Sequence, residues 1–380
     1  MLNWVGNDQP MKMRETSRAI DKKLWVNNSL KTTLFFDVAN SLYGEDGGLL
    51  ISVGEEPRPH HIPNAFYDEV DTFGQLIKMV DELCKQRNGA YSNIRLIGID
   101  TVDEVFKLAE AYVIAEYNAS VEDASKRTNT IRRAYGGYRA GEDRVKDLVV
   151  KTLFKLRKYN YGLFMIGHTK LKAKRDKLEE VEYEQLTSNL SADYYNTLKD
   201  KVNVVATAYV KRNFNNTKTE KDQYTKKDKT VGELISEQRV IVFRDDEFAI
   251  DCKSHFPDIV ESCEFSSNAF ITAITDAIKS QLAKQHNVVI SDEQLKEIQQ
   301  EQIKERDEIV EEMIQEEIKA ETAEELSSKR QEMLETIKKN QRLIEKSKLD
   351  EIREILKTVG KPLTELDDET LATVYDLAKL

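Results

Sequence analysis

A lysine followed by two threonines, Lys31-Thr32-Thr33, begins an amphipathic stretch near the start of the chain. An ammonium group and hydroxyls at the start of a helix are suited to holding phosphate, because the free N–H groups of the first turn point at the ligand. The apolar residues 24–26 predict a short strand, and residues 27–30 predict a tight turn before the helix. This order is typical of a phosphate-binding loop, so Lys31, Thr32 and Thr33 are the candidate phosphate ligands.

The turn before Lys31 departs from the full phosphate-binding pattern, which has a glycine directly before the lysine. Leu30 occupies that position, and the turn is about two residues shorter than the pattern requires. Each charge-assisted hydrogen bond from a glycine-rich turn to phosphate is worth about 1.5–3 kcal/mol. A shortened turn therefore predicts reduced affinity, and both normal hydrolysis and weak or absent hydrolysis remain open.

Two candidate catalytic residues stand at the ends of predicted strands. Residues 94–99 form an apolar run that ends at Asp100, and residues 161–167 form another that ends at His168. Ligands of open α/β sheets bind beyond the carboxyl ends of the strands. In NTPases an aspartate at such a place holds the Mg²⁺ that bridges the phosphates, and a histidine there can contact the terminal phosphate or the attacking water. The alternatives are that Asp100 only caps the next helix and that His168 is structural.

Basic residues concentrate in the segment 211–229, which we expect to be a loop between two strands. It has seven basic and three acidic residues within a chain of net charge −11, and Phe214 and Tyr224 are interspersed. This local excess favours contact with single-stranded DNA, while a solvated hairpin tip is the alternative. The candidate contacts are Lys211, Arg212, Lys218, Lys221, Lys226, Lys227 and Lys229.

Two other basic segments lie near the predicted strand ends. Residues 118–140 include four arginines around Gly136-Gly137 and are expected to form an exposed insert. An arginine there could meet phosphate charge from its own or a neighbouring subunit, although most such arginines are solvated. Residues 170–177 hold five basic residues and one acidic residue directly after the His168 strand.

The composition limits the classes of protein to which this chain can belong. The chain has 380 residues, 33% of them charged, and three widely spaced cysteines without metal-ligand spacing, which is typical of a reducing compartment. No apolar run approaches the ~18 residues of a membrane span, so we expect a soluble, cytoplasmic protein. Its net negative charge repels nucleic acid, and binding would need a local basic patch.

The periodicity of apolar residues predicts four regions. Residues 1–21 form a polar arm, and residues 22–287 alternate strands and helices as an α/β domain. Residues 288–347 have a narrow apolar stripe in a highly charged sequence, which is typical of a coiled-coil helix. Residues 348–380 predict a short C-terminal helical module.

The order of these signals resembles the RecA-like and AAA-type nucleotide-binding proteins that tailed bacteriophages encode in recombination and replication modules. The resemblance covers roughly residues 22–281 and is most specific in 97–103, which is similar to a second Walker motif, in 135–138 and in 161–170. It implies an α/β RecA-like P-loop NTPase core with a mostly parallel sheet flanked by helices, followed by a C-terminal helical or coiled-coil extension.

The same resemblance implies the roles of several residues. ATP would contact Lys31 and Thr32, Mg²⁺ would be held through Thr32 and Asp100, and His168 would sense the terminal phosphate. Implied partners are single-stranded DNA, other phage recombination or replication proteins and further copies of the chain, in the cytoplasm of the host cell. The alternative is a degenerate, non-hydrolysing domain that serves as a scaffold and recruits partners through its C-terminal coiled coil.

Overall fold

A computed structural model describes residues 14–15, 29–55, 62, 65–175, 182–221, 228–245, 249–286, 289–340 and 344–379. The strand predicted at residues 24–26 and most of the predicted arm lie outside the described residues. The chain divides into two compact units, Met1–Asp307 and Glu308–Leu380. None of the described helices combines the length and the apolar composition that crossing a membrane requires.

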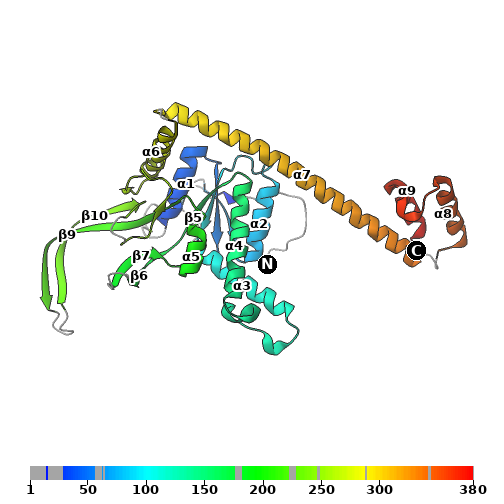
Figure 1. Cartoon of the computed structure of the whole chain (residues 1–380), viewed down its shortest axis with the longest axis horizontal. Coiled ribbons are helices and arrows are strands. Elements are labelled where there is room, and N and C mark those ends of the chain that lie inside the picture. Colours follow the sequence, from blue (N-terminus) through cyan, green and yellow to red (C-terminus); the bar gives the residue numbers. More distant parts are fainter. Residues whose placement is uncertain are drawn as a thin grey trace. The chain divides into compact units, whose positions relative to one another are not determined.

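The centre of the first unit is a sheet with the strand order β1-β3-β2-β4-β5 (Figure 1). Strands β2 to β5 are parallel, and β1 pairs antiparallel with β3. Both β2 and β4 are buried along their whole length, as expected for parallel strands covered on both faces. The predicted α/β class with a mostly parallel sheet is thereby confirmed. The strands are β1 (Arg14–Glu15), β2 (Gly48–Val53), β3 (Phe66–Val70), β4 (Leu96–Asp100) and β5 (Gly162–Ile166).

Helices cover both faces of this sheet. On one face α1 packs against α6, and on the other α2, α3 and α4 pack against one another (Figure 1). Thr72 caps the start of α2, because its hydroxyl accepts a hydrogen bond from the backbone N–H of Gln75 in a capping box. The helices are α1 (Ser29–Tyr43), α2 (Phe73–Lys85), α3 (Val102–Ser120), α4 (Ala140–Lys158), α5 (Ala192–Lys199) and α6 (Ser267–His286). Two 3₁₀ turns, η1 (Ala124–Lys126) and η2 (Ile131–Gly136), separate α3 from α4.

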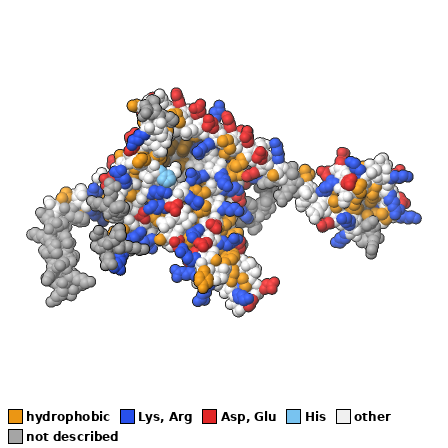
Figure 2. All heavy atoms as spheres, in the orientation of Figure 1, with side chains coloured by type: hydrophobic (Ala, Val, Ile, Leu, Met, Phe, Trp, Pro, Cys, Tyr) orange, Lys and Arg blue, Asp and Glu red, His pale blue; other side chains and the backbone are white. Residues whose placement is uncertain are grey.

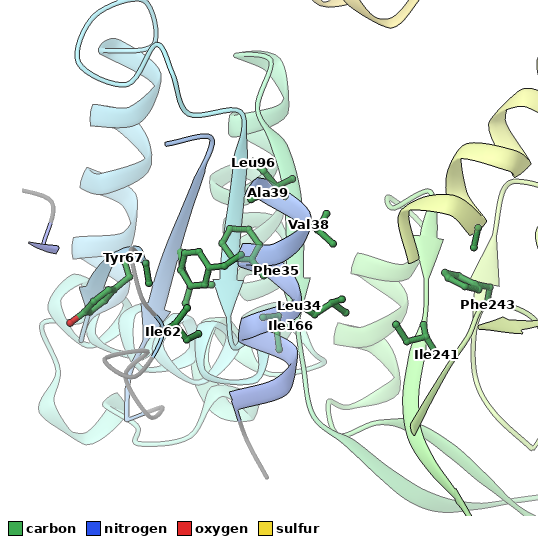
Figure 3. Close-up of a cluster of buried hydrophobic side chains, with 14 of the residues drawn as sticks. Leu34, Phe35, Val38, Ala39, Ile62, Tyr67, Leu96, Ile166, Ile241 and Phe243 are labelled. Atoms are coloured by element: carbon green, nitrogen blue, oxygen red, sulfur yellow. The ribbon is translucent and has the colours of Figure 1, made fainter. Parts of the chain in front are cut away.

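Helix α1 lies between the sheet and a second group of strands. Its side chains Phe35 and Ala39 belong to the same buried cluster as Leu96 of β4, and the cluster continues to Ile241 and Phe243 (Figure 3). An almost continuously apolar run in α1 is therefore buried on two sides. This double burial fixes the first turn of α1, with Lys31-Thr32-Thr33, against the sheet.

The segment expected to be a loop at residues 212–229 is instead largely an antiparallel hairpin of β9 and β10. The backbone groups of β9 and β10 are paired across the two strands, in keeping with the hairpin that the sequence left open as an alternative. The remaining strands are short or lie in small sheets. The strands are β6 (Thr169–Arg175), β7 (Glu182–Ser188), β8 (Val204–Val205), β9 (Thr207–Lys221), β10 (Asp228–Val242), β11 (Lys253–Ser254) and β12 (Ser262–Glu264).

The charged region that follows is a single helix, α7 (Asp292–Asn340). The second unit contains the later part of α7, then α8 (Lys346–Val359), a 3₁₀ turn η3 (Leu363–Glu365) and α9 (Asp368–Ala378). Gly360 ends α8 with a left-handed φ of 68°, as a C-terminal cap requires. The second unit has its own apolar core, formed by Ile337, Ile344, Ile352, Leu366, Leu371, Val374 and Ala378.

Candidate functional site

The first turn of α1 meets the carboxyl ends of β4 and β5. Thr32 Oγ1 donates a hydrogen bond to Asp100 Oδ2 over 2.7 Å, and both residues are buried. Lys31 Nζ donates to the carbonyl oxygen of Gly167 over 3.0 Å. Thr33 is half-buried in the same turn. Residues that are far apart in the chain are therefore in contact at one edge of the sheet.

Asp100 is a buried carboxylate at this edge, with 8% of its surface exposed. Burial raises the pKa of Asp100, whereas the hydrogen bond from Thr32 and the electrostatic influence of Lys31 and His168 act in the opposite direction. Asp100 does not cap the next helix, because the N-cap residue of α3 is Thr101. The carboxylate of Asp100 is directed instead to α1.

Asp103, the last residue of the motif 97–103, is also part of the site. Its Oδ2 accepts a hydrogen bond of 2.8 Å from the backbone N–H of His168 and lies 3.5 Å from His168 Nδ1. The side chain of Asp103 is 6% exposed, and its Oδ1 is buried with no hydrogen-bond partner among the described residues. Aspartates in the first turn of a helix are favoured by the helix dipole whether or not they are buried, so the burial of Asp103 has no signature in the sequence.

One peptide group joins these contacts. The Gly167–His168 peptide accepts from Lys31 at its carbonyl oxygen and donates to Asp103 at its N–H. A phosphate bound by Lys31 would have to compete with the Gly167 carbonyl. His168 itself remains 38% exposed, so its ring can reach a ligand beyond the strand ends.

The Thr32 hydroxyl and the Asp100 carboxylate are oxygen donors of the kind that Mg²⁺ binds. No group of three or more His, Cys, Asp and Glu side chains suited to a metal occurs in the described part of the chain. Mg²⁺ in nucleotide sites takes only one or two protein ligands and completes its octahedron with water and phosphate oxygens. The pair of Thr32 and Asp100 therefore fits Mg²⁺ that arrives with a nucleotide.

No protein-family model matches this chain, and a search of curated proteins finds no significant relative. Its function therefore has to be inferred from the geometry of the site.

One basic candidate on the β9–β10 hairpin, Arg212, is paired with an acidic residue. Arg212 Nε lies 3.0 Å from Glu237 Oε2. The strand register places Lys221 opposite Asp228 and Lys229 opposite Glu220. Lys211 and Lys218 lie on β9, and Lys226 and Lys227 lie outside the described residues.

Proposed function

We propose that this protein binds ATP at the edge of the sheet where α1 meets β4 and β5. The observation that carries the proposal is the buried Thr32–Asp100 hydrogen bond, which joins the start of a helix to the carboxyl end of a parallel strand. Anions bind at helix N-termini, and nucleotides bind beyond the carboxyl ends of parallel strands. Both conditions are met at this one place.

Each site residue has a role in this proposal. Lys31 and the N–H groups of the first turn of α1 bind phosphate oxygens. Thr32 and Asp100 would hold Mg²⁺, which neutralises phosphate charge when it is bound. His168 faces the terminal phosphate or the attacking water, and Asp103 holds the backbone of His168 in place.

We further propose that the protein is a RecA-like ATPase of phage recombination or replication that contacts single-stranded DNA. Support comes from the parallel sheet covered by helices on both faces, and from basic segments in a chain that is otherwise acidic.

Equilibrium binding of labelled Mg-ATP tests the nucleotide site. Lys31→Ala and Asp100→Ala should each weaken binding by about 10- to 150-fold, the equivalent of one charge-assisted hydrogen bond. Lys151→Ala, at an exposed position of α4, is the matched control and should leave the affinity unchanged. Equal affinity of the wild type and both site variants would overturn the assignment.

A second candidate function is a scaffold that does not hydrolyse ATP. Two observations favour it: the Lys31 ammonium is engaged by Gly167, and the second unit has a core of its own. A scaffold would bind no ATP at millimolar concentration. It would also lose self-association when the chain is truncated after Asp307. This truncation removes the second unit but keeps the part of α7 that contacts the first unit. Measurable ATP binding, or unchanged self-association after truncation, would argue against it.

A further inference from the structure

The segment between α3 and α4 carries an excess of positive charge: its two acidic residues, Glu122 and Asp123, lie at its start, and five basic residues follow them. Residues 124–139 contain five basic residues and neither Asp nor Glu, whereas residues 211–229 contain three acidic residues among seven basic ones. Figure 1 shows this segment projecting from the body of the first unit, and Figure 2 shows charges of both signs interspersed over the visible face. The five basic residues are Lys126, Arg127, Arg132, Arg133 and Arg139. We name residues 124–139 the arginine loop.

The tip of the arginine loop has an unusual backbone. Five consecutive residues, 135–139, have φ values between 49° and 86°. Gly136 and Gly137 adopt this region freely, but for a residue with a Cβ it costs on the order of 1–3 kcal/mol. Strain of this kind persists where surrounding contacts enforce it, and it is concentrated at functional sites.

Those enforcing contacts are present at the start of the tip. The hydroxyl of Tyr135 donates to Glu116 over 3.0 Å, and Arg144 binds the same carboxylate with two hydrogen bonds of 2.7 and 2.8 Å. The ring of Tyr135 also packs against Tyr117. At the other end of the tip, the guanidinium of Arg139 forms ion pairs with carboxylates of α4 and α5. The loop is therefore held in one shape by its base.

The residue that this shape presents is Tyr138, whose side chain is completely exposed. Arg127 and Arg133 are exposed as well, and neither has a carboxylate partner within the described residues. Arg132, by contrast, shares Glu142 with Arg139. The loop thus offers one accessible aromatic ring and two guanidinium groups that have no carboxylate partner in the described part of the chain.

We propose that the arginine loop binds single-stranded nucleic acid, with Tyr138 stacking on a base and Arg127 and Arg133 contacting phosphates. Proteins that bind single strands without sequence preference combine these two elements, exposed rings and cationic side chains. We propose a single strand and not a duplex because an exposed ring needs an unpaired base to stack on, and the bases of a duplex are covered on both faces. The inference rests on the nucleic-acid part of the proposed function and is independent of the ATP site.

The test is fluorescence anisotropy of the full-length protein with a labelled oligothymidylate and, in a second arm, an oligouridylate of equal length. Tyr138→Asn removes the ring but keeps the backbone, because asparagine tolerates left-handed φ. It should raise the Kd by about fivefold or more, the equivalent of one lost stacking contact. Tyr138→Phe retains the ring and should bind like the wild type.

The double variant Arg127→Gln/Arg133→Gln tests the phosphate contacts. It should weaken binding and reduce the slope of log K against log salt concentration by about 1.4, as expected for two lost phosphate contacts on a single strand. A variant of the β9–β10 hairpin, Lys218→Gln/Lys221→Gln/Lys229→Gln, is the competing site and should bind almost as the wild type does. Unchanged melting temperatures establish that each variant is folded.

Three outcomes would overturn the proposal. If the wild type binds and the Tyr138 and arginine variants bind equally well, the loop is not the contact. If only the hairpin variant loses affinity, the contact is the hairpin, and the nucleic-acid part of the proposed function stands. If the wild type binds neither oligonucleotide, both the loop and that part fail, while Mg-ATP binding still decides the nucleotide site separately.

Discussion

At the scale of single residues, the site is organised around a carboxylate kept away from water. The hydrogen bond from Thr32 stabilises the charged form of Asp100 and so opposes part of the rise in pKa that burial causes. Burial nevertheless dominates, and the pKa of Asp100 is raised above its usual value of 3.8. Residues arranged for binding commonly reduce stability in this way.

The raised pKa gives a prediction about stability and pH. Because the folded state holds the Asp100 proton more tightly than the unfolded state, the contribution of Asp100 to stability falls as pH rises through its folded pKa. Asp100→Asn keeps an acceptor for Thr32 and removes the buried charge. It should therefore raise the melting temperature near neutral pH, and this gain should shrink as the pH approaches 3.8.

Thermal denaturation of the wild type and Asp100→Asn at several pH values measures this effect. The matched control is Asp147→Asn, the same substitution at an exposed position of α4, which should change the melting temperature little at any pH. A neutral-pH melting temperature of Asp100→Asn below that of the wild type would show that the contacts of the carboxylate outweigh its burial.

At the scale of elements, Asp307 is one of the residues that attach the start of α7 to the rest of the first unit. Asp307 accepts hydrogen bonds of 2.7 and 2.8 Å from Arg95 Nη1 and one of 2.8 Å from Asn160 Nδ2. It also lies 3.3 Å from the guanidinium of Arg87, which is almost completely buried. Burial and the neighbouring Arg95 lower the pKa of Arg87, and Asp307 opposes this shift. The contact explains why the first compact unit extends to Asp307 and beyond the change of composition near residue 288.

Asp307→Asn should loosen this attachment. Removing one partner leaves the buried charge of Arg87 without its counter-charge, and we expect a loss of about 1–3 kcal/mol in the free energy of unfolding. Urea denaturation measures the loss. Glu308→Gln, at the exposed next position, should change the free energy by less than about 0.5 kcal/mol. Equal effects of the two substitutions would mean that Asp307 does not anchor the helix.

At the scale of the whole molecule, each of the two units has an apolar core, and these cores share no residue. The first is built around α1 and the central sheet, and the second is built from α8, α9 and the end of α7. Two separate cores allow the two units to unfold independently, because neither depends on the side chains of the other.

Leu371→Ala tests this independence. Leu371 is completely buried in the second core, and its truncation should cost about 2–5 kcal/mol. Hydrogen exchange should accelerate in residues 346–378 and stay unchanged in β4. Glu351→Gln, on the exposed side of α8, should alter neither. Faster exchange in β4 of the Leu371→Ala variant would show that the two units unfold together.

The sequence by itself determined the alternation of strands and helices and the positions of several site residues. The apolar runs of β2 and β4, the cap at Thr72 and the polar ends at Asp100 and His168 all follow from local patterns. Such patterns fix which segments bury an apolar face, so they are readable without the fold. Strand β3 was not predicted, because Asp68 and Glu69 interrupt its apolar pattern.

Only the tertiary structure decided which distant groups meet. It brought Thr32 to Asp100, placed the Gly167–His168 peptide between Lys31 and Asp103, and paired Arg212 of β9 with Glu237 of β10. It also presented Tyr138 at the tip of a strained loop. These contacts depend on how strands and helices pack, and side chains far apart in the chain carry no local signature of the partner they will meet.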